Sequence, residues 1–313
     1  MARVARLLVI AAVVAGLAGC SAREQNASGS DLADRKVRVT TTTNFITDTV
    51  RQIGGDRVDV TGLMGAGIDP HLYKASAGDV AKLRDADLIV YGGLNLEGKM
   101  ADLLEELGER QTTVALTKDI PRDRLLAPPQ GTAFEFDPHV WFDVTLWQIA
   151  ARTVAAALKD ADPQHAEVYD RNLARYLALL DETDAYVRER IETIPRARRV
   201  LVTSHDAFGY FGRRYDIDVV AIQGISTATE ATTASVQRVA KIIAEREVKA
   251  AFVESSVPRQ TIEAVLAAAR ERGADVRIGG ELYSDAAGDP GTPEGTYVGM
   301  IRANADRIAA GLR

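Results

Sequence analysis

The chain has 313 residues, of which 46% are hydrophobic, 26% charged and 6% aromatic. This length and composition allow about two globular domains with a substantial core. Nucleic-acid-binding proteins usually carry a basic face, whereas this chain has a formal net charge of −6 and no dense Lys/Arg cluster. We therefore expect no nucleic acid among its partners.

The first 35 residues carry the signals of an exported lipoprotein. Arg3 and Arg6 precede an apolar run at 7–17 that is too short to span a bilayer, and small residues then lead to Cys20, the only cysteine. The segment 1–20 resembles a bacterial lipoprotein signal peptide, in which Cys20 is lipidated and becomes the mature N-terminus. The alternative is an ordinary signal peptide that leaves an unused thiol. Residues 21–35 are polar and predict a flexible tether, so we expect a chain anchored to the outer face of the cytoplasmic membrane.

Residues 36–161 predict an N-terminal α/β lobe, because short apolar runs alternate with amphipathic segments. The expected strands are 37–42, 58–64, 88–91 and 114–116, and the expected helices are 45–54, 75–85, 99–107 and 144–158. A loop is expected at 126–137, where prolines and glycine gather. Alternation of this kind builds a parallel sheet with helices on both faces.

Residues 162–195 predict one uninterrupted linking helix. Asp162 is a candidate N-cap, Pro163 suits the first helical position, and Pro195 stops the helix. An apolar stripe recurs every seven residues, at Ala166, Leu173, Leu180, Val187 and Ile194. At 1.5 Å per residue the helix spans roughly 50 Å. It either forms a spine between two lobes or supplies half of a coiled coil.

Residues 196–313 repeat the pattern of the first half and predict a C-terminal α/β lobe. The expected strands are 199–203, 219–222, 250–253 and 276–278, and the expected helices are 207–215, 234–245, 259–272 and 297–312. The predicted fold is therefore α/β with two lobes, each a parallel sheet flanked by helices, joined by one long linking helix.

Three of the four histidines stand where a binding site is expected. His71 follows the strand 58–64 through a glycine-rich loop, His205 lies just beyond the strand 199–203, and His139 ends a loop before a helix. Parallel sheets bind ligands at the carboxyl ends of their strands. His165 lies in the first turn of the solvated linking helix, and we expect it to have no functional role.

Two of these histidines share the tripeptide Asp-Pro-His, at 69–71 and 137–139. Proline fixes its own φ and restrains the residue before it, so each imidazole is held on a stiffened backbone, as suits a metal ligand. The neighbouring carboxylates Asp69, Asp137 and Asp206 are candidates to orient the rings.

A fourth ligand is expected from the second lobe. Glu281, Asp285 and Asp289 all follow the last strand, and the strand-end rule does not choose among them. Glu254 also ends a strand, where it either supports a ligand or is a buried, hydrogen-bonded carboxylate. The sequence lacks a dinucleotide fingerprint and a phosphate-binding loop.

The strings GIDPHLYK, DPHVWFD, TSHDAFGYF, QGIST, FVESSVP and GGELYSDAAGD resemble, in order, those of the cluster A-I solute-binding proteins, the TroA/ZnuA-type metal receptors of bacterial ABC importers. The resemblance covers about residues 36–312. It implies that His71, His139, His205 and Asp285 are the metal ligands, two from each lobe. It also implies no enzymatic step, and a partnership with a membrane permease and its cytoplasmic ATPase.

The resemblance leaves the metal open between Mn²⁺ and Zn²⁺, with manganese slightly preferred. Several manganese receptors of the family carry Glu at the third ligand position, whereas this chain has His205, and the His-rich loop of many zinc receptors is missing from 126–137. Imidazole suits zinc and carboxylate suits manganese. Two rival functions are a receptor for a metal chelate, such as a siderophore or corrinoid, and a secreted metallohydrolase with Glu254 or Asp206 as general base.

Overall fold

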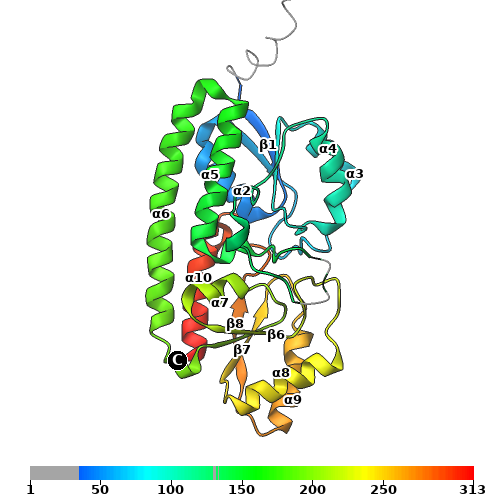
Figure 1. Ribbon diagram of the computed structural model, residues 1–313, viewed down its shortest axis with the longest axis vertical. Coiled ribbons are helices and arrows are strands. Elements are labelled where there is room, and N and C mark those ends of the chain that lie inside the picture. The colour runs from blue at the N-terminus through cyan, green and yellow to red at the C-terminus, as the bar shows by residue number, and fades with distance from the viewer. Residues whose placement is uncertain (1–34, 130–131, 133) are drawn as a thin grey trace, which may run out of the picture.

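The computed structural model describes residues 35–129, 132 and 134–313 (Figure 1). The predicted signal peptide 1–20 with Cys20, and the tether except for its last residue, lie outside the described residues, as does part of the loop 126–137. Among the residues that are described, no helix combines the length and the apolar character needed to cross a membrane.

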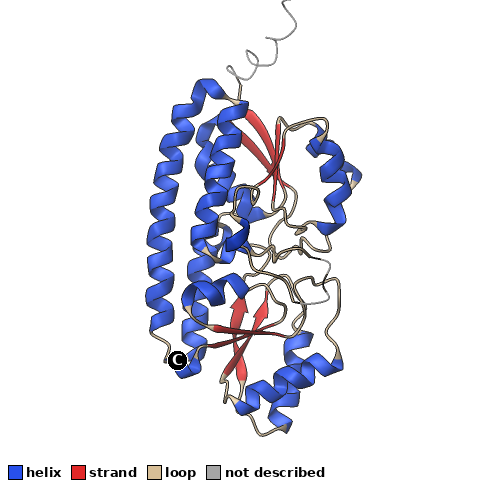
Figure 2. Ribbon diagram, viewed as in Figure 1, coloured by secondary structure: helices blue, strands red, loops and turns tan. Residues whose placement is uncertain are grey.

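The N-terminal lobe is built on a parallel sheet of four strands in the order β2-β1-β3-β4. Its strands are β1 (Val37–Thr41), β2 (Val58–Gly62), β3 (Leu88–Tyr91) and β4 (Thr113–Ala115), and its helices are α2 (Asn44–Gly54), α3 (Ala77–Arg84), α4 (Ala101–Gly108) and α5 (Val144–Ala161). Strand β3 is almost entirely buried because helices cover both faces of the sheet (Figure 2).

The C-terminal lobe repeats this design with the order β6-β5-β7-β8, again all parallel. Its strands are β5 (Val200–Thr203), β6 (Asp218–Ala221), β7 (Ala250–Glu254) and β8 (Arg277–Leu282), and its helices are α7 (Gly209–Tyr215), α8 (Thr233–Glu245), α9 (Gln260–Glu271) and α10 (Tyr297–Leu312). Short 3-10 helices lie at Gly55–Arg57, Gly98–Met100, Arg122–Arg124, Val140–Phe142, Pro163–His165, Arg196–Arg198 and Pro293–Gly295. The predicted fold class is confirmed.

The long helix α6 (Ala166–Glu192) runs alongside both lobes (Figure 1). It packs against α5, α10 and α2 of the same chain, so its apolar stripe faces its own chain and not a coiled-coil partner. Leu180, Val187 and Ile194 of the stripe are buried, and Ala166 and Leu173 are partly buried. The predicted long helix is confirmed, with Asp162 and Pro163 at its N-cap and first helical positions, but its first turn, Pro163–His165, is a 3-10 turn. The Asp162 side chain makes no cap there, because it accepts hydrogen bonds from His165 and Tyr169 instead.

A layer of aromatic side chains joins the lobes behind the carboxyl ends of the two sheets. Trp147 of α5 stacks on Tyr297 of α10 at 4.8 Å between ring centroids, and Phe142 stacks on Phe208 at 4.3 Å. All four rings are buried, and they belong to one hydrophobic core that reaches from β1 to α10. Because this shared core is closely packed, it supports the loops at the carboxyl ends of both sheets.

Candidate metal centre

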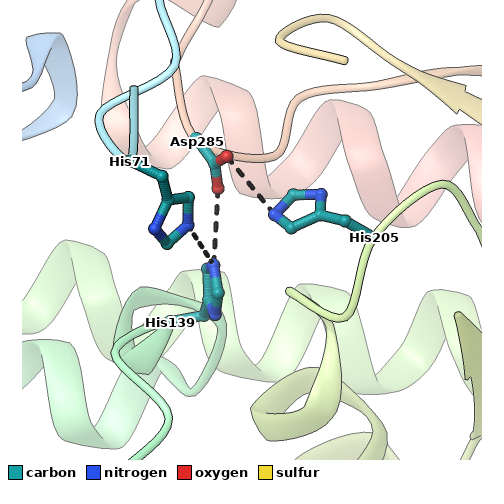
Figure 3. A group of neighbouring side chains, drawn as sticks. All are labelled: His71, His139, His205 and Asp285. Carbon is teal, nitrogen blue, oxygen red and sulfur yellow. Dashed lines mark hydrogen bonds and ion pairs between the residues drawn. The ribbon is translucent and has the colours of Figure 1, made fainter. Parts of the chain in front are cut away.

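The structure brings the three selected histidines and one of the three candidate carboxylates together between the lobes (Figure 3). His71 lies in the loop after β2, His139 just before the 3-10 turn at Val140–Phe142, His205 two residues beyond β5, and Asp285 three residues beyond β8. One ligand atom from each side chain lies within 4.8 Å of the others. His71 is 3% exposed and the other three are fully buried.

The nitrogens that face the centre are the Nε2 atoms. His71 Nε2 lies 3.3 Å from His139 Nε2, which in turn lies 3.6 Å from Asp285 Oδ1. His205 Nε2 lies 3.3 Å from Asp285 Oδ2 on the other side (Figure 3). His205 Nε2 and Asp285 Oδ1 have no hydrogen-bond partner among the described residues. Buried polar atoms normally find a partner, so these two are available to a cation at the centre.

Two of the three rings are oriented from behind by carboxylates. Asp137 Oδ1 lies 2.7 Å from His139 Nδ1, and Glu254 Oε2 lies 2.5 Å from His205 Nδ1. A carboxylate at Nδ1 favours the tautomer that carries its proton there, which leaves the Nε2 lone pair free for a metal.

The predicted orienting role is therefore seen for Asp137 and not for its two counterparts. Asp69 accepts a hydrogen bond from the main-chain nitrogen of His71 at 2.8 Å and another from the Thr227 hydroxyl of the other lobe, so it fixes a loop and not a ring. Glu254, not Asp206, binds the ring of His205. Both readings of Glu254 hold, because its Oε1 also accepts from the main-chain nitrogens of Ser204 and His205, at 2.7 and 2.9 Å.

Burial and neighbouring charges shift the pKa values of His71 and His205 in opposite directions. Burial lowers the pKa of His71 to about 3, against the opposing pull of Asp285. Burial also disfavours charge on His205, but the carboxylates of Asp285 and Glu254 outweigh it and raise its pKa well above the ordinary value. For Asp285, burial is outweighed by His205, so its pKa lies well below the usual range. In the metal-free centre the carboxylates thus favour the protonated form of His205, whereas burial favours the neutral form of His71.

We expect metal binding to release one proton near neutral pH, because a cation on Nε2 of His205 displaces the proton held there. The folded pKa of His205 is raised, so the proton competes below that pKa and the affinity falls as the pH falls, by up to about tenfold per unit. Calorimetric titration in two buffers of different ionisation enthalpy measures the released proton. A binding enthalpy that is the same in both buffers would contradict this expectation.

A cavity of about 550 Å³ opens beside His71. Asn95, Lys99 and Phe134 line it from the first half of the chain, and residues 224–226, 228 and 229 line it from the second. His71 is the one member of the centre with any exposed surface. His71 is therefore the member of the centre that borders this cavity.

His165 lies far from the centre in the fold, at the start of the long helix. Its Nδ1 bonds Asp162 at 2.8 Å, in a cluster with Arg57 and Tyr169 that ties the helix to the N-terminal lobe. These contacts are structural.

Sequence reasoning missed the residues that attach the Asp285 loop to the N-terminal lobe. Trp141 packs beside His139 at 5.1 Å between ring centroids, and its Nε1 donates to the carbonyl of Ser284 at 3.1 Å. Asn44 bonds the main chain at Ala287. The sequence holds no signal for these contacts, because they join positions more than 140 residues apart.

Comparison with known proteins points to metal-binding transport proteins. The "Manganese-binding lipoprotein MntA" of Bacillus subtilis (strain 168) is 46% identical over 297 residues, which is 95% of each chain. The "Zinc-binding protein TroA" of Treponema pallidum (strain Nichols) is 47% identical over 280 residues, 90% of each chain. These two relatives are named for binding manganese and zinc, the two metals between which the sequence did not decide.

Solved structures of metal-binding proteins have the same fold as this chain. The periplasmic zinc-binding protein TroA from Treponema pallidum superposes with a TM-score of 0.86, covering 88% of this chain and 99% of that one. A manganese-bound periplasmic metal-binding protein from Candidatus Liberibacter asiaticus, 26% identical, gives a TM-score of 0.79 over 89% of this chain and 100% of that one. Residues 39–311 match the family described as "Zinc-uptake complex component A periplasmic". With the resemblance noted in the sequence thereby confirmed, the chain belongs to this ZnuA/TroA family of periplasmic metal-binding proteins.

Proposed function

We propose that this protein captures a divalent transition-metal ion, Mn²⁺ or Zn²⁺, outside the cytoplasmic membrane and delivers it to an ABC import permease. The ion is bound by His71, His139, His205 and Asp285. The observation that carries this proposal is the convergence of three imidazole Nε2 atoms and one carboxylate in a buried space, with Nδ1 of two rings occupied by carboxylates. Three neutral nitrogens and one anionic oxygen form a donor set that suits either ion.

This donor set favours binding of a metal ion over metal-dependent catalysis. Four protein ligands complete a tetrahedral zinc site and leave no position for an activated water, whereas catalytic zinc keeps such a position open. Glu254, one of the two carboxylates considered as a general base, has another task here, since it binds three nitrogen atoms of Ser204 and His205. This proposal therefore assigns the protein no enzymatic activity.

The proposed partners are a membrane permease with its cytoplasmic ATPase, and the membrane itself through a lipid on Cys20. Relatives named as lipoproteins and as substrate-binding components of manganese ABC transporters support both. Residues 21–35 serve as the tether between the lipid and the lobes 36–161 and 196–313, which the helical segment 162–195 joins. Cell fractionation tests the anchor, because Cys20→Ser should move the protein out of the membrane fraction.

Titration of the metal-stripped chain from Ser21 onward with free Mn²⁺ and, separately, Zn²⁺ tests the proposal. We expect one ion to bind per chain, and the ratio of the two affinities ranks the cargoes. Intrinsic preference for Zn²⁺ at nitrogen sites means that the tighter ion need not be the transported one. If neither free ion binds, the ion receptor is rejected in favour of a chelate receptor.

A further inference from the structure

The segment that carries Asp285 belongs to the C-terminal lobe in sequence, but side chains of the first half of the chain hold its main chain. Trp141 Nε1 donates to the carbonyl of Ser284 at 3.1 Å. Asp48 of α2 accepts from the main-chain nitrogen of Tyr297, where α10 begins, at 2.9 Å. Asn44, the first residue of α2, binds between these two points.

Asn44 makes a two-point bond to a single residue. Its Nδ2 donates to the carbonyl of Ala287 at 2.8 Å, and its Oδ1 accepts from the main-chain nitrogen of Ala287, also at 2.8 Å. Nδ2 lies 3.4 Å from the next carbonyl, at Gly288. A paired donor and acceptor contact fixes the orientation of the Ala287 peptide groups as well as their distance from Asn44. Ala287 is fully buried and lies two residues beyond Asp285.

Asp285 has little else to hold its carboxylate. Oδ1 has no hydrogen-bond partner in the described part of the chain, and Ser256 Oγ approaches Oδ2 only at 3.5 Å. The remaining neighbours are the histidines of the centre itself. The position of this carboxylate therefore depends on the path of its main chain, and Asn44 bonds that path at the nearest anchored residue on its C-terminal side.

We infer that Asn44 is a positioning residue for metal capture: by binding Ala287 it keeps the Asp285 carboxylate within reach of His71 and His139. This inference rests on the proposed function. It makes α2, which begins just after β1, the support of a ligand from the other half of the chain. Three of the four ligands are then attached to the N-terminal lobe, and His205 is the one held by the C-terminal sheet.

Two substitutions in the mature protein test this role. Asn44→Ala removes both bonds, while the nearly isosteric Asn44→Asp keeps the acceptor for Ala287 N–H but places a carboxylate oxygen against the Ala287 carbonyl. We expect either change to weaken Mn²⁺ and Zn²⁺ binding by about 10- to 100-fold, the usual effect of losing a group that orients a metal ligand. Gln164→Ala changes an exposed amide in the first turn of the long helical segment, away from the centre, and is the control that should leave the affinity unchanged.

A double-mutant cycle separates positioning from general stability. If Asn44 acts through Asp285, then Asn44→Ala should cost no further affinity in an Asp285→Ala background. Wild-type affinity in both Asn44 variants, or losses that simply add in the double variant, would overturn the inference. Failure of the unmodified protein to bind either ion would instead reject the proposed function, so the two ideas fail separately.

Discussion

Replacing Asp285 with alanine is expected to weaken binding of Mn²⁺ and Zn²⁺ by on the order of 10³-fold, the equivalent of about 4 kcal/mol for breaking a buried charge pair. Asp285 is the only anionic member of the centre and is fully buried, so water does not replace its carboxylate easily. It also lies within 3.6 Å of the Nε2 atoms of His139 and His205. Competition titration of metal-stripped protein against a chelator of known affinity measures the loss.

The same loop supplies the control for this experiment. Asp289 is exposed four residues further on, and Glu281 is exposed four residues before. Asp289→Ala removes an identical charge from the same segment without touching the centre, so its affinity should stay at the wild-type value. A loss of binding in Asp289→Ala together with unchanged binding in Asp285→Ala would reject the proposed ligand set.

The two sheets were predictable because their strands are short apolar runs bounded by polar turns. The predicted strand at 88–91 coincides with β3, and the predicted helix at 297–312 coincides with α10. Buried parallel strands need nearly continuous apolar sequence, which makes them easy to find. Once the strands were placed, their carboxyl ends pointed to His71 and His205.

The centre was less predictable where the choice depends on side-chain packing. Glu281 lies inside β8, which runs to Leu282, whereas Asp285 and Asp289 follow it. Only the path of the loop over Asn44 and Trp141 buries Asp285, while Glu281 and Asp289 are exposed. That path is a contact between distant parts of the chain. The resemblance to a family selected Asp285, whereas local pattern did not.

The start of the linking helix shows the same limit. Asp162 followed by proline predicts a cap, since both residue types are common at helix starts. In the fold, Asp162 is buried against Arg57 of the N-terminal lobe and bonds His165 and Tyr169. The bonds of this buried carboxylate outweigh a side-chain cap, because an unpaired buried charge is costly. Local pattern could not reveal Arg57, which lies 105 residues away in the sequence.

The carboxylates around His139 and His205 determine how these two rings are oriented. Asp137 and Glu254 contact Nδ1 of His139 and His205, while Asp285 lies on the Nε2 side of both rings, so each of these Nε2 atoms points toward the Asp285 carboxylate. His71 is the ring beside the open cavity. We therefore expect an entering ion to meet His71 before the three fully buried members of the centre.

Glu254→Gln is expected to weaken metal binding by about 10- to 100-fold while leaving the fold largely intact. The amide oxygen can still accept from the main-chain nitrogens of Ser204 and His205, but the amide NH₂ would face Nδ1 of His205 in place of Oε2. An NH₂ group donates, so the neutral ring must accept at Nδ1 and carry its proton on Nε2. The atom that should bind the metal is then protonated.

Glu254→Ala separates this tautomer effect from the loss of structure. Alanine leaves two buried main-chain N–H groups without their acceptor, each costing about 1–3 kcal/mol, so the free energy of unfolding of the metal-free protein should fall by roughly 2–6 kcal/mol. Urea denaturation measures that change, and metal titration of both variants measures the affinity. Asp206→Asn, next to His205 but not bonded to its ring in the structure, should change neither quantity strongly. If Glu254→Gln binds metal as tightly as the wild type, Glu254 supports the loop alone, and the orientation of His205 must come from the pull of Asp285 on Nε2.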